Sequence, residues 1–203
     1  MYQHALKTAA IGSALMFMAA GSTFAADEGK INFNMVVSAG AKPCLPNARA
    51  EVRIISSGTA EDMYIEATGL PPNTDFDFFV IQVPKAPFGL SWYQGDLQTN
   101  SYGEAHQHFR GRFNIETFIV APGSAPAPVV FPDGLFPDAS LNPPFNPIQT
   151  YHLGLWFNSP MDAKNAGCPA TVTPFNGEHN AGIQVLNTAN FPDDHGPLRD
   201  LVP

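Results

Sequence analysis

Short runs in which apolar and polar residues alternate constrain the fold of this chain more than any other feature. Within residues 50–56, Val52 and Ile54 alternate with the charged residues Glu51 and Arg53, and residues 63–68 repeat the pattern. Successive side chains of a β-strand point to opposite faces, so this period of two predicts strands with one buried face.

Further apolar runs follow along the chain, separated by turn-forming residues. The predicted strands are 31–38, 50–56, 63–68, 75–83, 92–99, 105–120, 151–157 and 183–188. The run 105–120 is long enough to bend near Gly111. Between two of them, residues 69–74 contain adjacent prolines, which fix φ and donate no ladder hydrogen bond, so a rigid corner is expected there. Short strands at this spacing predict an all-β protein, a single antiparallel β-sandwich.

Composition supports an all-β protein over a helical one. The chain has 20 prolines and 17 glycines, and only 14% of its residues are charged. Helical bundles are instead rich in charged residues and alanine, and poor in residues that form turns.

The first 25 residues have the pattern of a secretory signal peptide. Lys7 precedes a largely apolar, uncharged run at residues 8–20, and Thr23 and Ala25 supply the small residues of a cleavage site. We therefore expect cleavage before Ala26 and a secreted or periplasmic product, with residues 26–203 as one domain. The alternative is an N-terminal core helix. The apolar run is too short to span a membrane, and no second span follows.

The charge balance excludes two classes of partner. All 18 acidic residues but only nine of the ten basic ones follow residue 25, which leaves a net charge of about −9. Nucleic acids and anionic membranes both require a basic surface, so we expect neither as a partner.

The two cysteines, Cys44 and Cys168, predict one disulfide. In an oxidising compartment an isolated pair usually forms a structural bridge. The alternative is a reactive thiol, which needs a basic neighbour, and the nearest in sequence is Lys42.

The second half of the chain contains three further features. Residues 121–149 hold eight of the prolines and three phenylalanines, which predicts a long Pro-rich strap; a ligand-binding loop is the alternative. Ser159 before Pro160 is typical of a helix start, and Gly167 ends the helix, so a short helix is expected at 160–166. Residues 190–203 are expected to form an irregular surface tail.

A polar stripe is the main candidate ligand-binding surface. If the strand continues through it, His106, His108, Arg110 and Arg112 share one face. This face is either solvated, or a contact for an anion or a protein partner. The metal alternative uses His106, His108 and His179, with His152 in reserve and Glu178 as acid–base. The two guanidiniums beside the histidines oppose a divalent cation.

Other candidate chemistry is weaker. Asp75 and Asp77 share a face beside the corner, where they either begin a calcium site or are simply solvated. Trp92, Tyr93 and Trp156 either stack on a sugar or belong to the core. The chain contains neither a Gly-x-Ser-x-Gly nucleophile elbow nor a phosphate-binding glycine loop.

Two sets of segments carry resemblances. Residues 69–74, 93–100 and 102–103 resemble the corner and the glycine-bearing hairpin of fibronectin type III-like exported bacterial domains. Residues 152–157 and 173–182 are similar to segments of uncharacterised secreted bacterial β-sandwich proteins. These resemblances imply export and an immunoglobulin/fibronectin-like sandwich, and they carry no functional residues.

The sequence therefore predicts a secreted or envelope-associated binding or structural module that is not an enzyme and has no cofactor. Its partner is an unknown protein, an anionic ligand or a carbohydrate. The expected ligand-binding residues are His106, His108, Arg110, Arg112 and Trp156. The alternatives are a metal-dependent enzyme built on the histidines and a carbohydrate-binding module.

Overall fold

The computed structural model describes residues 29–115, 117–119, 148–174 and 180–202. The predicted signal peptide, most of the predicted strap, Glu178 and His179 lie outside the described residues. Within the described ranges, no helix is long and apolar enough to cross a membrane.

The described structure consists mainly of antiparallel strands. These are β1 (Lys30–Val37), β2 (Arg49–Ser56), β3 (Glu61–Thr68), β4 (Asp75–Ile81), β5 (Ser91–Gln98), β6 (Ala105–Gly111), β7 (Phe118–Ile119), β8 (Ile148–Gln149), β9 (His152–Phe157) and β10 (Gln184–Asn187). Eight of them form one sheet in the order β5-β4-β9-β10-β1-β2-β3-β6, and β7 pairs with β8 separately. The predicted all-β, antiparallel class is confirmed.

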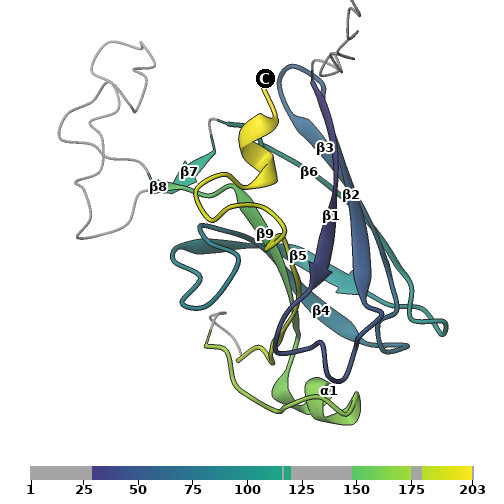
Figure 1. Cartoon of the computed structure of the whole chain (residues 1–203). Helices are drawn as coiled ribbons and strands as arrows, with labels where there is room; N and C mark the ends of the chain where they lie inside the picture. The colour runs from purple at the N-terminus through teal and green to yellow at the C-terminus, as the bar shows by residue number, and fades with distance from the viewer. Residues whose placement is uncertain (1–28, 116, 120–147, 175–179, 203) are drawn as a thin grey trace, which may run out of the picture.

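The sheet curls until its two edge strands meet, which makes it nearly barrel-shaped (Figure 1). Across the seam, the Gln107 side chain on β6 donates a hydrogen bond to the Asp96 carbonyl on β5 at 2.7 Å. The ring of Phe109 stacks on Phe78 of β4 with 5.6 Å between centroids. On the opposite side of the sheet, β1 and β10 pair at only two positions.

The alternation predicted for β2 and β3 is confirmed residue by residue. Val52 pairs with Ile65 and Ile54 pairs with Met63, and all four side chains are buried. On β9, Leu153, Leu155 and Phe157 face the same main core. Burial of these apolar faces on one side of each strand holds the sheet around a common core.

A second, smaller apolar cluster covers the other face of β4 and β9. It consists of Phe79, Ile81, Trp156 and Ala181, with Phe88 packed against it. Because both faces of β4 are covered, residues 76–81 are all buried.

The predicted corner after β3 depends on a glycine. Gly69 has a φ of +72°, and a Cβ built there would overlap the Asn47 carbonyl oxygen. Glycine is the residue that adopts this conformation without steric cost.

The predicted helix and the predicted disulfide are both confirmed. Helix α1 (Pro160–Asn165) begins after Ser159, whose hydroxyl accepts the Asp162 N–H at 3.1 Å. The helix ends at Asn165 with Ala166 as its C-cap, just before Gly167. Cys44 and Cys168 are disulfide-bonded with their Cα atoms 5.3 Å apart, which links the β1–β2 connection to the segment after α1.

Two predictions need correction. The strand predicted at 105–120 is not continuous, because β6 ends at Gly111 and the backbone N–H of Phe113 bonds instead to the Glu61 carboxylate at 2.6 Å. The tail is not only a surface segment. It contains the 3-10 helix η2 (Pro197–Asp200), at the opposite end of the molecule from α1 (Figure 1), and Leu198 and Leu201 are buried in the core.

Candidate functional site

The structure places the predicted polar stripe on the outer face of the sheet. His106, His108 and Arg110 are exposed on β6, and Arg112 is exposed just beyond its end. The neighbouring strand β3 presents Asp62, Tyr64 and Glu66 along the same face, opposite them in register.

Acidic residues of β3 already engage the positive charges of this stripe. Asp62 lies 2.8 Å from His108 Nε2 and 3.1 Å from Arg110 Nη1. Arg112 Nη1 lies 3.7 Å from the buried carboxylate of Glu61. An anionic ligand at this face therefore competes with carboxylates of the protein itself.

Tyr64 contacts His108 of the stripe on one neighbouring strand and Arg53 of β2 on the other. The His108 ring stacks on it with centroids 4.6 Å apart, and the Arg53 guanidinium lies 4.9 Å from its centroid. A hollow of about 210 Å³ beside these residues is lined by Glu51, Arg53, Tyr64 and Glu66. Its two carboxylates oppose an anion here as well.

The predicted metal ligands do not converge in the described part of the chain. No three His, Cys, Asp or Glu side chains gather there in a way that could hold a metal ion. His106 and His108 are on β6, His152 is on β9, and His179 lies outside the described residues. Of the carboxylates considered for calcium, Asp75 is exposed and Asp77 is buried.

His152 is buried and links β9 to the C-terminal tail. Its Nε2 lies 3.2 Å from the Asp193 carbonyl and its Nδ1 lies 2.8 Å from Thr188 Oγ1. The Asp193 carbonyl can only accept, so Nε2 of the neutral ring carries the proton, and Nδ1 accepts from the Thr188 hydroxyl, whose oxygen accepts the Leu153 N–H at 3.2 Å. Burial lowers the pKa of His152 below 6.5, and hydrogen bonds to backbone carbonyls and the charge of Asp193 partly oppose this shift.

The aromatic candidates have different surroundings. Trp156 is fully buried, and its indole packs edge-on against Phe79 and Phe88 at 5.4 and 5.1 Å. Trp156 therefore belongs to the core, which is the alternative to sugar stacking, and these two rings cover it. Trp92 is half-buried and donates to Gln94 at 3.2 Å, whereas Tyr93 is exposed and donates to Asp96 at 2.6 Å.

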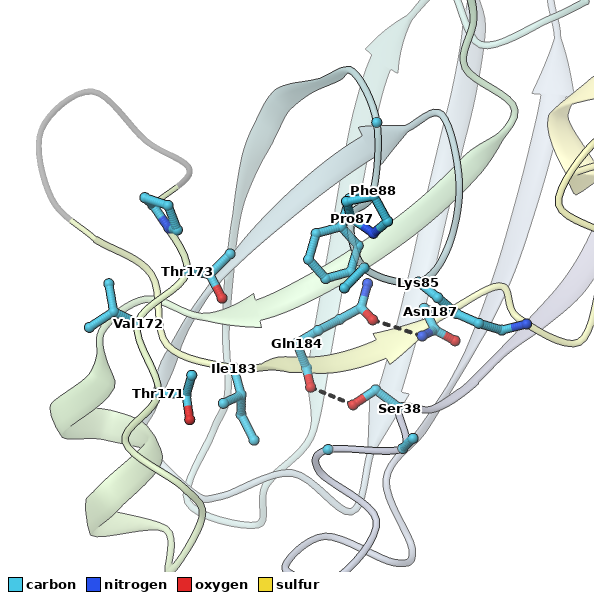
Figure 2. A pocket seen from close by; sticks show the side chains of 15 residues that line it. Ser38, Lys85, Pro87, Phe88, Thr171, Val172, Thr173, Ile183, Gln184 and Asn187 are labelled. Atoms are coloured by element: carbon cyan, nitrogen blue, oxygen red, sulfur yellow. Dashed lines mark hydrogen bonds between the residues drawn. The ribbon is translucent and has the colours of Figure 1, made fainter.

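A cavity of about 610 Å³ lies elsewhere in the described structure. Three segments that are distant in sequence form its walls: 38–40 after β1, 85–89 between β4 and β5, and 171–174 after α1. Figure 2 shows Pro87 and Phe88 on one side, Val172 and Thr173 on another, and Ile183 and Gln184 of the β10 segment between them.

Polar groups on the β10 side of the cavity are held in place by hydrogen bonds. Ser38 Oγ donates to the Gln184 carbonyl at 2.5 Å, and Asn187 Nδ2 donates to Gln184 Oε1 at 2.8 Å (Figure 2). Within the described ranges, the buried Nε2 of Gln184 has no hydrogen-bond acceptor. The floor is therefore ordered and contains a donor that remains unsatisfied.

Phe88 has a φ of +59°, a left-handed conformation that is rare for a bulky residue. Such a conformation costs about 1–3 kcal/mol and persists only where the surroundings enforce it. Here the ring packs on Trp156 and lines the cavity at the same time. The backbone strain is therefore located at the cavity wall.

The charge at the cavity wall is positive. Among the described residues that line it, Lys85 alone is charged. Its Nζ lies 3.7 Å from Asp193 Oδ1, and both side chains are more than half exposed. The sequence patterns did not predict this site. The signal that could have found it is the connection at residues 82–90, which is unusually apolar and much longer than the two-residue turn that is enough to join two antiparallel strands.

Comparison with known proteins gives no assignment: no family model and no curated protein matches the chain.

Proposed function

We propose that this protein is a secreted or envelope-associated module, not an enzyme, which binds a small apolar ligand in the cavity beside Phe88. Export is supported by the signal-peptide pattern of residues 1–25 and by the disulfide. The immunoglobulin/fibronectin-like sandwich and the likeness to secreted bacterial proteins are part of the same proposal. The two-residue pairing of β1 with β10 supports a sandwich, because the sheet divides there into two halves of four strands.

The observation that carries the proposal is the cavity itself. Its volume of about 610 Å³ is in the range of small-molecule sites, and its walls are mainly apolar with a few ordered polar groups. The polar stripe at His106–Arg112 is a weaker candidate site, because Asp62 and Glu61 already contact His108, Arg110 and Arg112.

The test uses N-phenyl-1-naphthylamine, a neutral apolar dye that becomes fluorescent in dry sites. Gly40 lines the cavity, and a Cβ built there meets open space. Gly40→Phe therefore adds a ring at the cavity wall without a clash of its Cβ. We expect the wild-type protein to bind about one equivalent of dye, and Gly40→Phe to weaken binding at least tenfold.

Met161→Phe is the matched control, since it adds a ring to an exposed position on α1. It should bind the dye as the wild type does. Circular dichroism verifies that each variant is folded, and Val172→Trp, at a half-exposed wall position, replaces Gly40→Phe if the latter fails to fold. Unchanged dye binding in the folded cavity variant would show that the cavity is not the site.

A further inference from the structure

We infer that the ligand of this cavity is a small amphipathic acid, with an apolar body against Phe88 and a carboxylate that contacts Lys85. The inference rests on the proposed function and specifies its ligand class.

The first argument is charge complementarity. Lys85 supplies the only charge among the described lining residues, and no described carboxylate faces the interior. A cationic ligand would meet Lys85 as a like charge, whereas an anionic group gains a charge-assisted contact at the rim.

The second argument is the hydrogen-bonding character of the walls. Lys85 only donates, and the unsatisfied polar atom on the floor, Gln184 Nε2, is also a donor. Gln184 Oε1 already accepts from Asn187 Nδ2, and Ser38 Oγ already accepts the Ala41 N–H at 3.2 Å while its own hydrogen goes to the Gln184 carbonyl. The polar end of a suitable ligand is therefore an acceptor, and a carboxylate supplies two acceptor oxygens.

The third argument is the state of Lys85 without a ligand. Its ion pair with Asp193 is 3.7 Å long and well exposed, so the pair is weak and easily exchanged. A ligand carboxylate can replace Asp193 as the partner of Lys85 at little cost. The apolar walls, including Phe88, Pro87 and Ile183, then receive the rest of the molecule.

The experiment compares three probes that share one tail: decanoate, decan-1-ol and decylammonium, each titrated by displacement of N-phenyl-1-naphthylamine at pH 8. We expect decanoate to bind about three- to five-fold more tightly than decan-1-ol, the factor that a partly exposed ion pair provides. Decylammonium should bind more weakly than decan-1-ol. The preference for decanoate should shrink as salt is raised from 0.02 to 0.5 M, roughly as screening predicts.

Two variants assign the effect to its residues. Lys85→Gln should abolish the preference for decanoate over decan-1-ol. Asp193→Asn, which removes the competing carboxylate and keeps the backbone carbonyl bonded to His152, should increase the preference.

The possible failures are distinguishable. Equal binding of decanoate and decan-1-ol, with both lost in Gly40→Phe, would show that the ligand need not be an acid, although the cavity would still be the binding site. A preference that persists in Lys85→Gln would overturn the role of Lys85, and with it the inference. If no probe displaces the dye while Gly40→Phe still weakens dye binding, the inference about the ligand fails and the proposed function stands. If Gly40→Phe leaves the binding of dye and probes unchanged, the proposed function fails as well.

Discussion

The ring of Phe109 covers the backbone of Gly95, and this contact closes the seam between β5 and β6. A Cβ built on Gly95 would lie 2.6 Å from Phe109 Cε1. Gly95 also lies next to a bulge, where the register of β4 with β5 shifts between Phe78 and Phe79. A small residue at this point lets the two edges of the sheet approach each other.

We therefore expect Gly95→Ala to lower the free energy of unfolding by about 1–3 kcal/mol, because the added methyl group must displace the Phe109 ring. Urea denaturation measures this loss. Gly58→Ala is the control. Gly58 has a φ of +85°, so alanine there also strains the backbone, but its Cβ meets open space and displaces no ring. Equal losses in the two variants would show that backbone conformation alone is responsible, and not the seam.

Glu61 should be essential for the stability of the segment that follows β6. Its carboxylate is fully buried and accepts the Phe113 N–H at 2.6 Å and the Asn114 side-chain amide at 2.8 Å. Glu61→Gln removes the charge and turns a donor toward these donors, so we expect a loss of about 2–3 kcal/mol in unfolding free energy. Glu66→Gln, on the same strand but exposed, should change stability much less. A similar effect of both substitutions on the urea midpoint would contradict this role.

His152 should make the protein less stable in mild acid. Its pKa in the folded protein is lowered by burial, so between that value and about 6.5 the unfolded chain binds a proton that the folded protein does not. The contribution of neutral His152 to the free energy of unfolding is fully present above pH 6.5. It is lost as the pH falls, by up to about 1.4 kcal/mol per pH unit.

Unfolding free energies measured from pH 5 to 8 test this expectation. His152→Gln should flatten the slope below pH 6.5, although its overall stability is lower. His106→Gln, which removes an exposed imidazole, should keep the slope of the wild type. The assignment to His152 is wrong if the slope survives its replacement.

The disulfide should contribute substantially to stability. It joins residues 124 positions apart, and a bridge that closes so long a loop is worth about 2–5 kcal/mol. We expect the Cys44→Ser/Cys168→Ser variant to lose this amount in urea denaturation, and the reduced wild type to behave like the variant. Reductant that leaves the wild-type midpoint unchanged would contradict the prediction.

The polar stripe should not hold a transition metal in the purified protein. His108 Nε2 is engaged by Asp62, and the Arg110 guanidinium shares that carboxylate. Elemental analysis of untagged protein, with no metal added, should find far less than stoichiometric zinc, iron or copper. Near-stoichiometric metal that disappears in His108→Ala would restore the metal-dependent enzyme as the leading hypothesis.

Local patterns predicted much of the fold. The alternation in β2 and β3, the proline corner after Gly69 and the start of α1 at Ser159 each depend on residues close together in sequence. The disulfide was predictable because only two cysteines are present. In the 105–120 segment the alternation continued past Gly111, but a tertiary contact to Glu61 ended the strand, and a periodic pattern does not contain such contacts.

The sites were harder to predict than the strands. Alternation predicts that His108 and Arg110 share a face, but only the pairing of β6 with β3 reveals that Asp62 lies between them. The cavity is assembled from three segments, each of which has the composition of an ordinary turn. Only the fold brings Ser38, Phe88 and Val172 together.

The bond between Cys44 and Cys168 has a further consequence for the integrity of the chain. A single peptide-bond cleavage anywhere between these two residues opens the backbone, yet it releases no fragment, since the bridge still joins both pieces. A protease-nicked molecule would therefore migrate as intact protein on a gel until a reductant separates its halves.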